Sequence, residues 1–214
     1  MSPLFHWAAK KGDGAAPERP ASLITESLST SRALPKFIAA LSHQSAPVLL
    51  DLGPVVGTNV SFFGDRLGCK MLIEDLHEEI EASIRERAPE SLAGRLKDRI
   101  AGVAASPVDG ILCWDLFNYL DRTAARELAA SLRAILRPKG VLHGLFGTVA
   151  QPGATRTRFI VQSDTAMKCR TEPWVPVTRQ AFQTGEITRM FEGLTVVESV
   201  LLQSKTRETL LRKP

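Results

Sequence analysis

Residues 48–63 of this chain read VLLDLGPVVGTNVSFF, and this stretch decides the fold. It begins with an apolar run that is interrupted by Asp51, as expected of a short strand buried on both faces. Two glycines, Gly53 and Gly57, then indicate a turn, and an apolar pattern typical of a helix follows. A strand, a glycine turn and a helix in this order begin a βαβ unit, so we expect a parallel sheet.

The same alternation of strand and helix patterns continues along the chain. Apolar runs predict strands at residues 48–52, 70–73, 110–114, 141–146, 158–162, 195–203 and 208–211. Helical patterns lie at residues 23–43, 59–67, 76–88, 121–136 and 178–191. We therefore expect an α/β fold. It is a doubly wound, mostly parallel sheet of about six to seven strands with an antiparallel C-terminal hairpin, in a three-layer αβα sandwich.

Length and composition indicate one globular domain. The chain has 214 residues, of which 44% are hydrophobic and 23% charged. The N-terminal residues are small, polar and broken by glycine and proline, which predicts a flexible tail over residues 1–22 and a single domain over residues 23–214. No apolar run approaches the roughly 20 residues that span a bilayer, so no membrane partner is expected.

The cysteine pattern argues for a reducing compartment. Cys69, Cys113 and Cys169 are far apart and odd in number, which fits neither a disulfide framework nor a zinc site of the CxxC type. The N-terminus also lacks the long apolar segment of a secretory signal, so we expect a cytoplasmic protein. No set of metal ligands and no oligomeric state is indicated by the sequence.

Basic residues become denser after Gly147. They are Arg156, Arg158, Lys168, Arg170, Arg179, Arg189, Lys205, Arg207, Arg212 and Lys213. Such a face can meet nucleic acid or an anionic substrate. An ordinary solvated surface is the favoured interpretation, because aromatic residues do not interleave with these charges.

The glycine turn is suited to a ligand at the carboxyl end of its strand. In open parallel sheets ligands bind outside the carboxyl ends of the strands. Gly53 and Gly57 let the backbone pass close to a ligand, and the helix that follows presents free N–H groups. The turn does not match the G-x-G-x-x-G dinucleotide fingerprint, because its glycines are four positions apart and Val55 lies between them.

Four segments in order carry a resemblance to a known family. The D-L-G-x-x-x-G turn at Asp51–Gly57 resembles motif I of class I S-adenosylmethionine-dependent methyltransferases. The LIE sequence that ends at Glu74, DGILCWDLFNYL at 109–120 and LRPKGVL at 136–142 resemble the second strand, the fourth strand and the entry to the fifth strand of that family. The terminal residues 191–214 are similar to its closing antiparallel strands, so the resemblance covers about residues 36–214.

The resemblance implies an S-adenosylmethionine-dependent methyltransferase that acts on a small molecule. The implied cofactor-binding residues are Asp51, Gly53, Pro54, Gly57, Glu74, Asp75, Asp115 and Leu116, and the implied substrate-binding residues are Trp114, Asn118 and Tyr119. Glu74 is expected to bind the ribose hydroxyls, with its neighbour Asp75 as the replacement if the register differs by one. The insertion at about 147–177 is a candidate substrate cap. No catalytic base is assigned, because methyl transfer depends mainly on alignment and the exclusion of water.

Two features keep other functions open. Val55 replaces the middle glycine of the family's turn, and DRIAGVAASPV at 98–108, where a short or degraded third strand is expected, lacks the acid that contacts adenine. A non-catalytic binding or scaffolding protein on the same fold is therefore one alternative. A methyltransferase that modifies RNA or protein through the basic C-terminal region is the other.

Each polar candidate also has an ordinary structural interpretation. Asp51 can cap the turn, and Glu74 and Asp115 can be acids at helix N-termini. His143, inside the predicted fifth strand, is expected to be a hydrogen-bonded structural residue. Two positions are open for His77, one near the adenosine of the implied cofactor and one exposed at the start of a helix, and the exposed one is favoured.

Overall fold

The computed structural model describes residues 24–103 and 107–214, so the tail expected over residues 1–22 lies outside the described residues. A six-stranded sheet with the order β3-β2-β4-β5-β9-β8 forms its centre. Its strands are β2 (Val48–Asp51), β3 (Lys70–Ile73), β4 (Val108–Trp114), β5 (Leu136–Gly147), β8 (Thr195–Leu201) and β9 (Thr206–Arg212). The first four are parallel to one another, and β9 and β8 add an antiparallel hairpin at the β5 edge. The expected fold class is confirmed.

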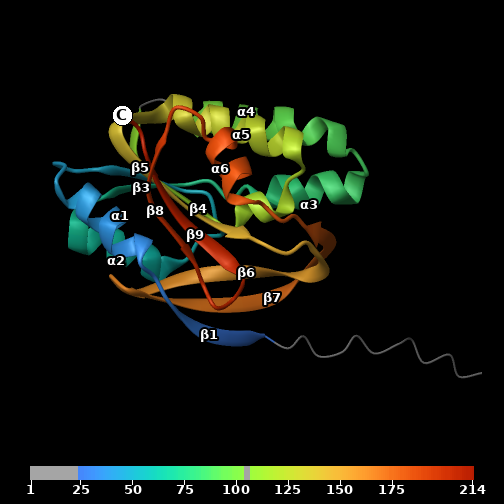
Figure 1. The fold of residues 1–214 in the computed structure, drawn as a ribbon, viewed down its shortest axis with the longest axis horizontal. Coiled ribbons are helices and arrows are strands. Elements are labelled where there is room, and N and C mark those ends of the chain that lie inside the picture. Colours follow the sequence, from blue (N-terminus) through green and yellow to red (C-terminus); the bar gives the residue numbers. More distant parts are fainter. Residues whose placement is uncertain (1–23, 104–106) are drawn as a thin grey trace, which may run out of the picture.

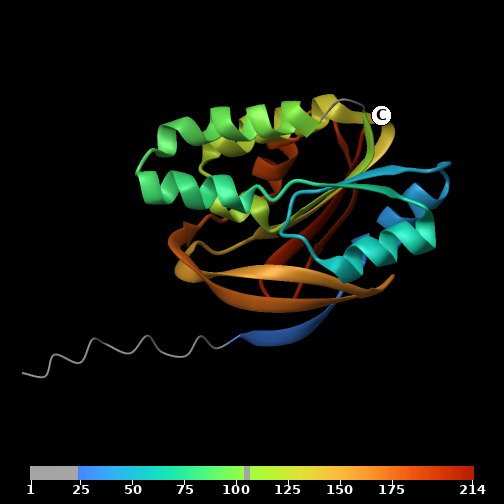
Figure 2. The same ribbon diagram turned by 180° about the vertical axis from the view of Figure 1, so that it is seen from behind.

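Helices cover both faces of this sheet (Figures 1 and 2). One layer holds α1 (Ala33–Ser42) and α2 (Gly57–Leu67). The other holds α3 (His77–Glu86), α4 (Leu92–Val103), α5 (Arg122–Ile135) and α6 (Thr184–Met190), with the 3₁₀ turns η1 (Pro89–Ser91) and η2 (Leu116–Tyr119). Consecutive residues of β2 face opposite cores, since Leu49 packs with the first layer and Leu50 with the second. None of the helices within the described ranges is long and apolar enough to cross a membrane.

A second sheet lies below the first in Figure 1, at the carboxyl ends of its parallel strands. It is antiparallel with the order β1-β7-β6, and its strands are β1 (Thr25–Thr30), β6 (Gln151–Ser163) and β7 (Ala166–Arg179). Most of the insertion expected at 147–177 therefore forms a long hairpin. Asn59 of α2 joins this hairpin to the central domain: its side chain donates to the carbonyl oxygen of Phe159 and accepts from the backbone N–H of Val161, both at 2.8 Å.

Replacing Asn59 with alanine is expected to lower the free energy of unfolding by about 1–3 kcal/mol, because two buried backbone groups of β6 lose their partner. Asn59 is only 1% exposed, so water cannot easily take over these bonds. Urea denaturation measures the effect, and faster amide exchange in β6 should accompany it. The control is Ser61→Ala at an exposed position of the same helix, expected to change stability by less than about 0.5 kcal/mol. Equal effects of the two substitutions would contradict the role of Asn59.

Three predicted elements are corrected by the structure. The helix expected over residues 23–43 is wrong in its first half, because Thr25–Thr30 pairs with β7 as an edge strand and α1 begins only at Ala33. The helix expected over 178–191 begins only at Thr184, since the preceding residues extend β7 through Arg179. No strand forms between α3 and β4 within the described residues. Instead α4 occupies 92–103, with Leu92, Leu96 and Ile100 buried at helical spacing.

Candidate active site

Asp51 ends β2 with its carboxyl group enclosed. It is 2% exposed, and its Oδ1 accepts from the backbone N–H of Gly53 at 3.0 Å and from indole Nε1 of Trp114 at 2.6 Å. Burial raises the pKa of Asp51 to about 7, in spite of these two bonds, which act in the opposite direction. The carboxyl group on which the family resemblance depends is therefore covered by a side chain of β4.

Trp114 holds this position with a strained backbone. It ends β4 with φ at 48°, a region that bulky residues rarely adopt. Its ring stacks on Phe159 of β6, with ring centroids 5.4 Å apart and planes 7° apart. A Cβ on Gly53 would lie 2.7 Å from Cδ1 of the indole, so only glycine fits there. The absence of a Cβ at Gly53 thus lets the indole of Trp114 lie close, and the ligand contact expected at Gly53 stays a prediction.

The rest of the glycine turn is more open. Pro54 is buried, whereas Val55 is 61% exposed and its carbonyl oxygen accepts from Arg158 at 3.4 Å. At Gly57, the first residue of α2, a Cβ would meet no described atom within 4 Å. The N-cap residue Val56 makes no side-chain capping bond, so N–H groups of the first turn can bind a ligand.

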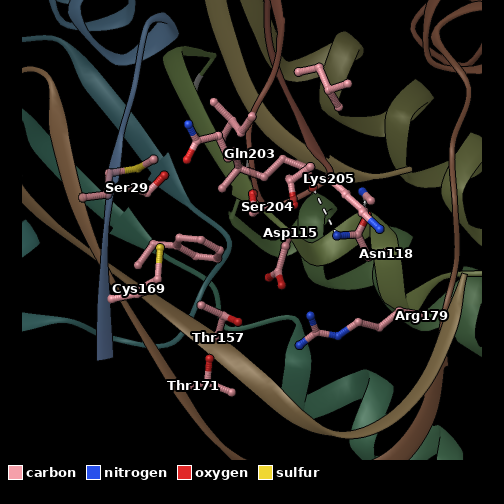
Figure 3. Close-up of a pocket in the computed structure, with 18 of the residues that line it drawn as sticks. Ser29, Asp115, Asn118, Thr157, Cys169, Thr171, Arg179, Gln203, Ser204 and Lys205 are labelled. Carbon is pink, nitrogen blue, oxygen red and sulfur yellow. Dashed lines mark hydrogen bonds between the residues drawn. The ribbon is translucent and has the colours of Figure 1, made fainter. Parts of the chain in front are cut away.

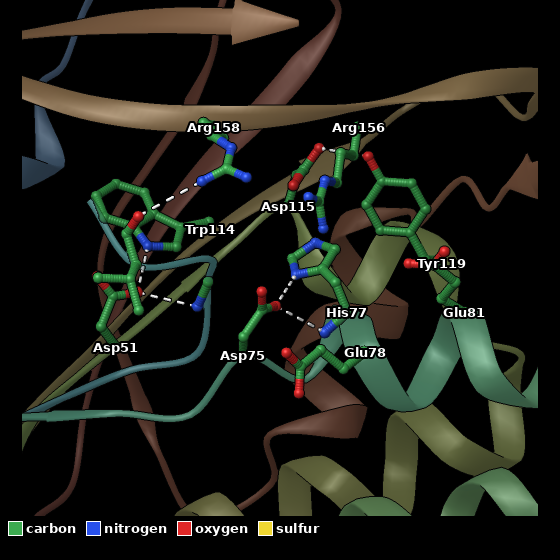
Figure 4. Close-up of polar contacts among 12 residues, drawn as sticks. Asp51, Asp75, His77, Glu78, Glu81, Trp114, Asp115, Tyr119, Arg156 and Arg158 are labelled. Atoms are coloured by element: carbon green, nitrogen blue, oxygen red, sulfur yellow. Dashed lines mark hydrogen bonds and ion pairs between the residues drawn. The ribbon is translucent and has the colours of Figure 1, made fainter. Parts of the chain in front are cut away.

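The two neighbouring acids after β3 point to different partners. Glu74 forms an ion pair with Arg99 of α4, and Arg99 also binds Glu79 at 2.7 Å. Oδ1 of Asp75 accepts from the backbone N–H of His77 at 3.1 Å and lies 3.2 Å from its ring Nδ1. Burial acts to raise the pKa of Asp75, but the hydrogen bonds and charge of His77 outweigh it and hold that pKa below its usual value. Of the two acids, Asp75 is the one that lies with the other site residues (Figure 4).

His77 is buried, contrary to the exposed position expected from the sequence. It is 1% exposed, because its ring packs edge-on against Tyr119 and against Trp174 of β7, at centroid distances of 5.5 and 5.6 Å. Its Nε2 has no hydrogen-bond partner among the described residues. The bond between Nδ1 and Asp75 fixes the ring, and the D-L-H spacing is the signal from which this pair was predictable.

Asp115 and Tyr119 come together directly after β4. Oδ2 of Asp115 accepts from the Tyr119 hydroxyl at 3.1 Å, whereas Oδ1 is buried and unpartnered within the described part of the chain. Burial raises the pKa of Asp115, and the positive charges of His77 and Arg179 offset only part of that effect. A buried acceptor without a donor indicates a place for a ligand group or a water molecule.

Leu116 and Asn118 lie in η2 but face the protein. Leu116 is completely buried in the core between the sheet and α3–α6. The amide of Asn118 donates to the carbonyl oxygen of Leu145 at 3.3 Å and accepts from the N–H of Gly147 at 2.8 Å. Both residues therefore fix η2 to its surroundings, and Asn118 additionally borders the cavity described below.

The hairpin contributes residues that sequence reasoning did not assign to the site. Figure 4 shows Arg156 and Arg158 of β6 above the acidic side chains. Both donate through Nε to Oε1 of Glu172, at 2.7 and 2.8 Å. The sequence singled out the two arginines only as part of a basic region. Their position depends on the pairing of β6 with β7, which no local pattern specifies.

A cavity of about 1030 Å³ lies beside this cluster, between the second sheet and the β5–β9–β8 edge of the first (Figure 3). Asp115, Asn118, Phe159 and Arg179 lie on its wall. The glycine turn and Asp75 do not line it. The site thus has two parts, a cluster of acidic side chains under the hairpin and the cavity, and Asp115 belongs to both. Within residues 24–103 and 107–214, no group of His, Cys, Asp and Glu side chains is arranged to hold a metal ion.

Comparisons with known proteins agree with this architecture. No protein-family model and no curated protein sequence matches the chain. Among solved structures, the chain is similar to the 1,6-didemethyltoxoflavin-N1-methyltransferase of Burkholderia thailandensis, with a TM-score of 0.50 and 16% identity over 85% of this chain and 77% of that one. This likeness shows that the chain has the class I, Rossmann-like fold of S-adenosylmethionine-dependent methyltransferases.

Two further structures are similar at slightly lower scores. The amino pentose methyltransferase CalS10 of Micromonospora echinaspora gives a TM-score of 0.49 and 16% identity, over 85% of this chain and 89% of that one. The glycopeptide N-methyltransferase MtfA gives a TM-score of 0.48 and 17% identity, over 85% and 93%.

Proposed function

We propose that this chain transfers a methyl group from S-adenosylmethionine to a small molecule. The observation that carries the proposal is the meeting of Asp51, Asp75 and Asp115 next to a cavity of about 1030 Å³. Asp51 ends β2, and Asp75 and Asp115 follow β3 and β4. The strands β3 and β4 lie on opposite sides of β2, so the connections diverge at the end of β2, which is the usual ligand site of such sheets. S-adenosylmethionine carries an ammonium and a sulfonium but no phosphate, so carboxylates suit it.

The residues fit this cofactor in part. Asp75, with a side chain 19% exposed, Oδ1 of Asp115 and the open start of α2 at Gly57 can receive it. Bound there, S-adenosylmethionine supplies an activated methyl group. The stacked aromatic rings of Trp114 and Phe159 would exclude water beside the acidic cluster. Asp115 faces both parts of the site and is placed to orient an acceptor group that carries a proton.

A small acceptor is favoured over nucleic acid by the partners of the basic residues. Arg156 and Arg158 bind Glu172, and Lys168 binds Glu26. Lys213 donates to two backbone carbonyl oxygens. These cations are occupied within the protein, whereas phosphate binding needs cations that are free to meet the backbone of the nucleic acid.

One alternative is favoured by a specific observation. Asp51 is bound by Trp114, and Glu74 is bound by Arg99, so two of the acids that the family resemblance assigns to the cofactor already have partners. A non-catalytic protein that keeps the fold but binds no S-adenosylmethionine would show this arrangement.

Calorimetric titration with S-adenosylmethionine and S-adenosylhomocysteine distinguishes a methyltransferase from the non-catalytic alternative. We expect saturable binding by the wild-type protein and an affinity lowered about tenfold or more in Asp75→Asn, because a charged hydrogen-bond partner contributes about 1.5–3 kcal/mol. Trp114→Phe keeps the stacking on Phe159 and releases Asp51, so it should bind S-adenosylmethionine more tightly than the wild type. The control is Asp65→Asn, an exposed acid on α2, which should bind like the wild type.

Catalysis is then tested by the release of S-adenosylhomocysteine when the protein is incubated with S-adenosylmethionine and a panel of small amines and phenols. No binding heat for either ligand at millimolar concentration, in wild type and in Trp114→Phe, would establish the non-catalytic alternative.

A further inference from the structure

The charged residues that line the large cavity leave it with an excess of positive charge. Its basic lining residues are Arg32, Arg179 and Lys205, and among the described residues on its wall Asp115 alone is acidic. Within residues 24–103 and 107–214 none of these three cations forms an ion pair, whereas Arg156 of the same hairpin pairs with Glu172. Unpaired cations around a cavity attract an anionic ligand.

Asp115 opposes an anion less than an exposed acid would. Its carboxyl group is 4% exposed, and its Oδ2 accepts from the Tyr119 hydroxyl at 3.1 Å. Burial raises the pKa of Asp115, which favours the uncharged form of this carboxyl group. The cavity therefore keeps its positive character although one acid lies on its wall.

Arg179 is the cation best placed to bind an anion inside the cavity. It ends β7, is half-buried, and its Nη2 donates to the carbonyl oxygen of Thr155 at 3.0 Å. Its guanidinium group also lies over the Tyr119 ring, 5.2 Å from the ring centroid. These two contacts hold the group in place, and its other nitrogens have no hydrogen-bond partner among the described residues. A planar guanidinium group with free N–H groups is suited to a carboxylate, which can accept two parallel hydrogen bonds.

Two hydroxyl groups of the second sheet lie on the same part of the wall. Thr157 of β6 and Thr171 of β7 are direct partners in the antiparallel register, so their side chains share one face of the hairpin. Figure 3 shows both threonines and Arg179 around the same space. In the part of the chain that the structure describes, neither hydroxyl group has a hydrogen-bond partner, and both residues line the cavity. They can therefore donate to an anion that Arg179 binds.

The other two cations act mainly on the entry of a ligand. Arg32 and Lys205 line the cavity but are exposed, so they lie where it opens to solvent. Solvent and salt screen such charges, which attract an incoming anion without holding it strongly.

We propose that this cavity binds a small organic acid, whose carboxylate accepts from Arg179 and from the hydroxyl groups of Thr157 and Thr171. That this acid is the methyl acceptor rests on the proposed function, whereas its binding does not. The methyl transfer would then take place elsewhere on the acid, at a group that its carboxylate helps to position.

The probe is 4-hydroxybenzoate, with 4-hydroxybenzamide as the neutral and 4-hydroxybenzylamine as the cationic ligand of the same shape. Titration calorimetry at pH 7 and low salt, without S-adenosylmethionine, should give an affinity for the acid about tenfold above that for the amide. The amine should bind most weakly. Arg179→Gln is expected to weaken binding of the acid about tenfold and to leave binding of the amide nearly unchanged. Arg179→Lys keeps the charge and should retain a preference for the acid over the amide.

Arg170→Gln is the matched control, because it makes the same change of charge on β7 at a residue that does not line the cavity. It should bind 4-hydroxybenzoate like the wild type. The double variant Arg32→Gln, Lys205→Gln should weaken binding about two- to threefold and reduce its dependence on salt. Circular dichroism and thermal melts confirm that each variant is folded.

Three results would overturn the acid site. One is no binding of 4-hydroxybenzoate at millimolar concentration, and another is binding of the amide or the amine as tight as that of the acid. The third is an equal loss in Arg170→Gln and Arg179→Gln, which would mean that net charge and not the assigned residue attracts the ligand.

Titration with S-adenosylmethionine separates this inference from the proposed function. Binding of S-adenosylmethionine without binding of 4-hydroxybenzoate defeats the inference alone. Binding of 4-hydroxybenzoate in a protein that binds neither S-adenosylmethionine nor S-adenosylhomocysteine supports the acid site and defeats only its interpretation as an acceptor site.

Discussion

Replacing Glu208 of β9 with leucine is expected to lower the free energy of unfolding by about 3–5 kcal/mol, because several buried hydrogen-bonding groups lose their acceptor at once. Glu208 is fully buried, and its Oε1 accepts from the Ser31 hydroxyl and lies 3.0 Å from Nε2 of His143. Its Oε2 accepts from the backbone N–H groups of Arg32 and Ala33 at 2.9 and 3.3 Å. The substitution leaves His143 and the start of α1 without their acceptor. Urea denaturation at pH 7 measures the loss.

The control is Glu198→Gln at a surface ion pair with Lys36, which is expected to change stability by less than about 1 kcal/mol. The conservative variant Glu208→Gln keeps the shape of the side chain and should lose less than Glu208→Leu. Burial acts to raise the pKa of Glu208, but the bonds from His143, Ser31 and Arg32 hold it below its usual value. The stabilisation by Glu208 is therefore present above the unfolded-state pKa of about 4.3 and is lost as pH falls through the lower folded-state pKa. A loss below 1 kcal/mol for Glu208→Leu at pH 7 would contradict the cluster's role.

The cluster around Glu208 also matters for the position of the cavity. Ser31 stands between β1 and α1, and Glu208 fixes it to the central sheet. β1 in turn carries Ser27 and Ser29, which line the cavity. A buried polar cluster thus connects the two sheets near the cavity. His143, expected to be a hydrogen-bonded structural residue, lies within this cluster.

The parts of the fold that local patterns specify were predictable. Apolar runs bounded by turn residues located β2, β3 and β4, because strands buried on both faces are nearly continuous in apolar residues. The helical pattern at 121–136 located α5, and Asp121 caps its start by accepting from the N–H groups of Thr123 and Ala124, both at 2.8 Å. The α4 helix was also predictable from the sequence, since Leu92, Leu96 and Ile100 recur every four residues. The resemblance to the methyltransferase family led instead to the expectation of a strand in this region.

Elements that depend on distant partners were not predictable in this way. Thr25–Thr30 reads TESLST and forms a strand only because β7, about 140 residues later, pairs with it. Its alternation is too weak to exclude a helix. The exposure pattern of this edge strand, with Leu28 turned to solvent, follows from the same pairing.

In the candidate site, too, some positions were predictable from local sequence patterns and others depended on distant partners. The order of strands placed Asp51, Asp75 and Asp115 at one edge of the sheet, because carboxyl ends of parallel strands meet there. The sequence did not indicate that Trp114 would cover Asp51, since this contact depends on stacking against Phe159 in the second sheet. Nor did it indicate that Arg99 of α4 would bind Glu74. Side-chain partners that lie on separate elements are set by tertiary packing, and their identity required the structure.

The stability of Asp51→Asn relative to the wild type is expected to rise by about 2–4 kcal/mol between pH 5 and pH 8. Burial raises the pKa of Asp51 to about 7, whereas the unfolded chain has the ordinary value of about 3.9. Between these values the folded state holds a proton that the unfolded state has released, so the contribution of Asp51 to stability falls as pH rises through this window. Asparagine stays neutral and keeps an oxygen for the N–H of Gly53 and the indole of Trp114.

Urea denaturation of both proteins at pH 5 and pH 8 gives the difference directly, and shared contributions from Asp75, Glu172 and Glu208 cancel in it. The exposed-acid control Asp65→Asn should follow the wild type at both values. A stability difference between Asp51→Asn and wild type that does not change with pH would mean that Asp51 stays ionised, and its enclosure by Trp114 would then be wrong.

The protonation of Asp51 also affects the proposed function. A cationic cofactor that binds Asp51 needs the charged form of this carboxyl group, so S-adenosylmethionine should bind more tightly above pH 7 than below it. In Asp51→Asn that part of the pH dependence should disappear, which separates a carboxyl group that serves the cofactor from one that only closes the turn.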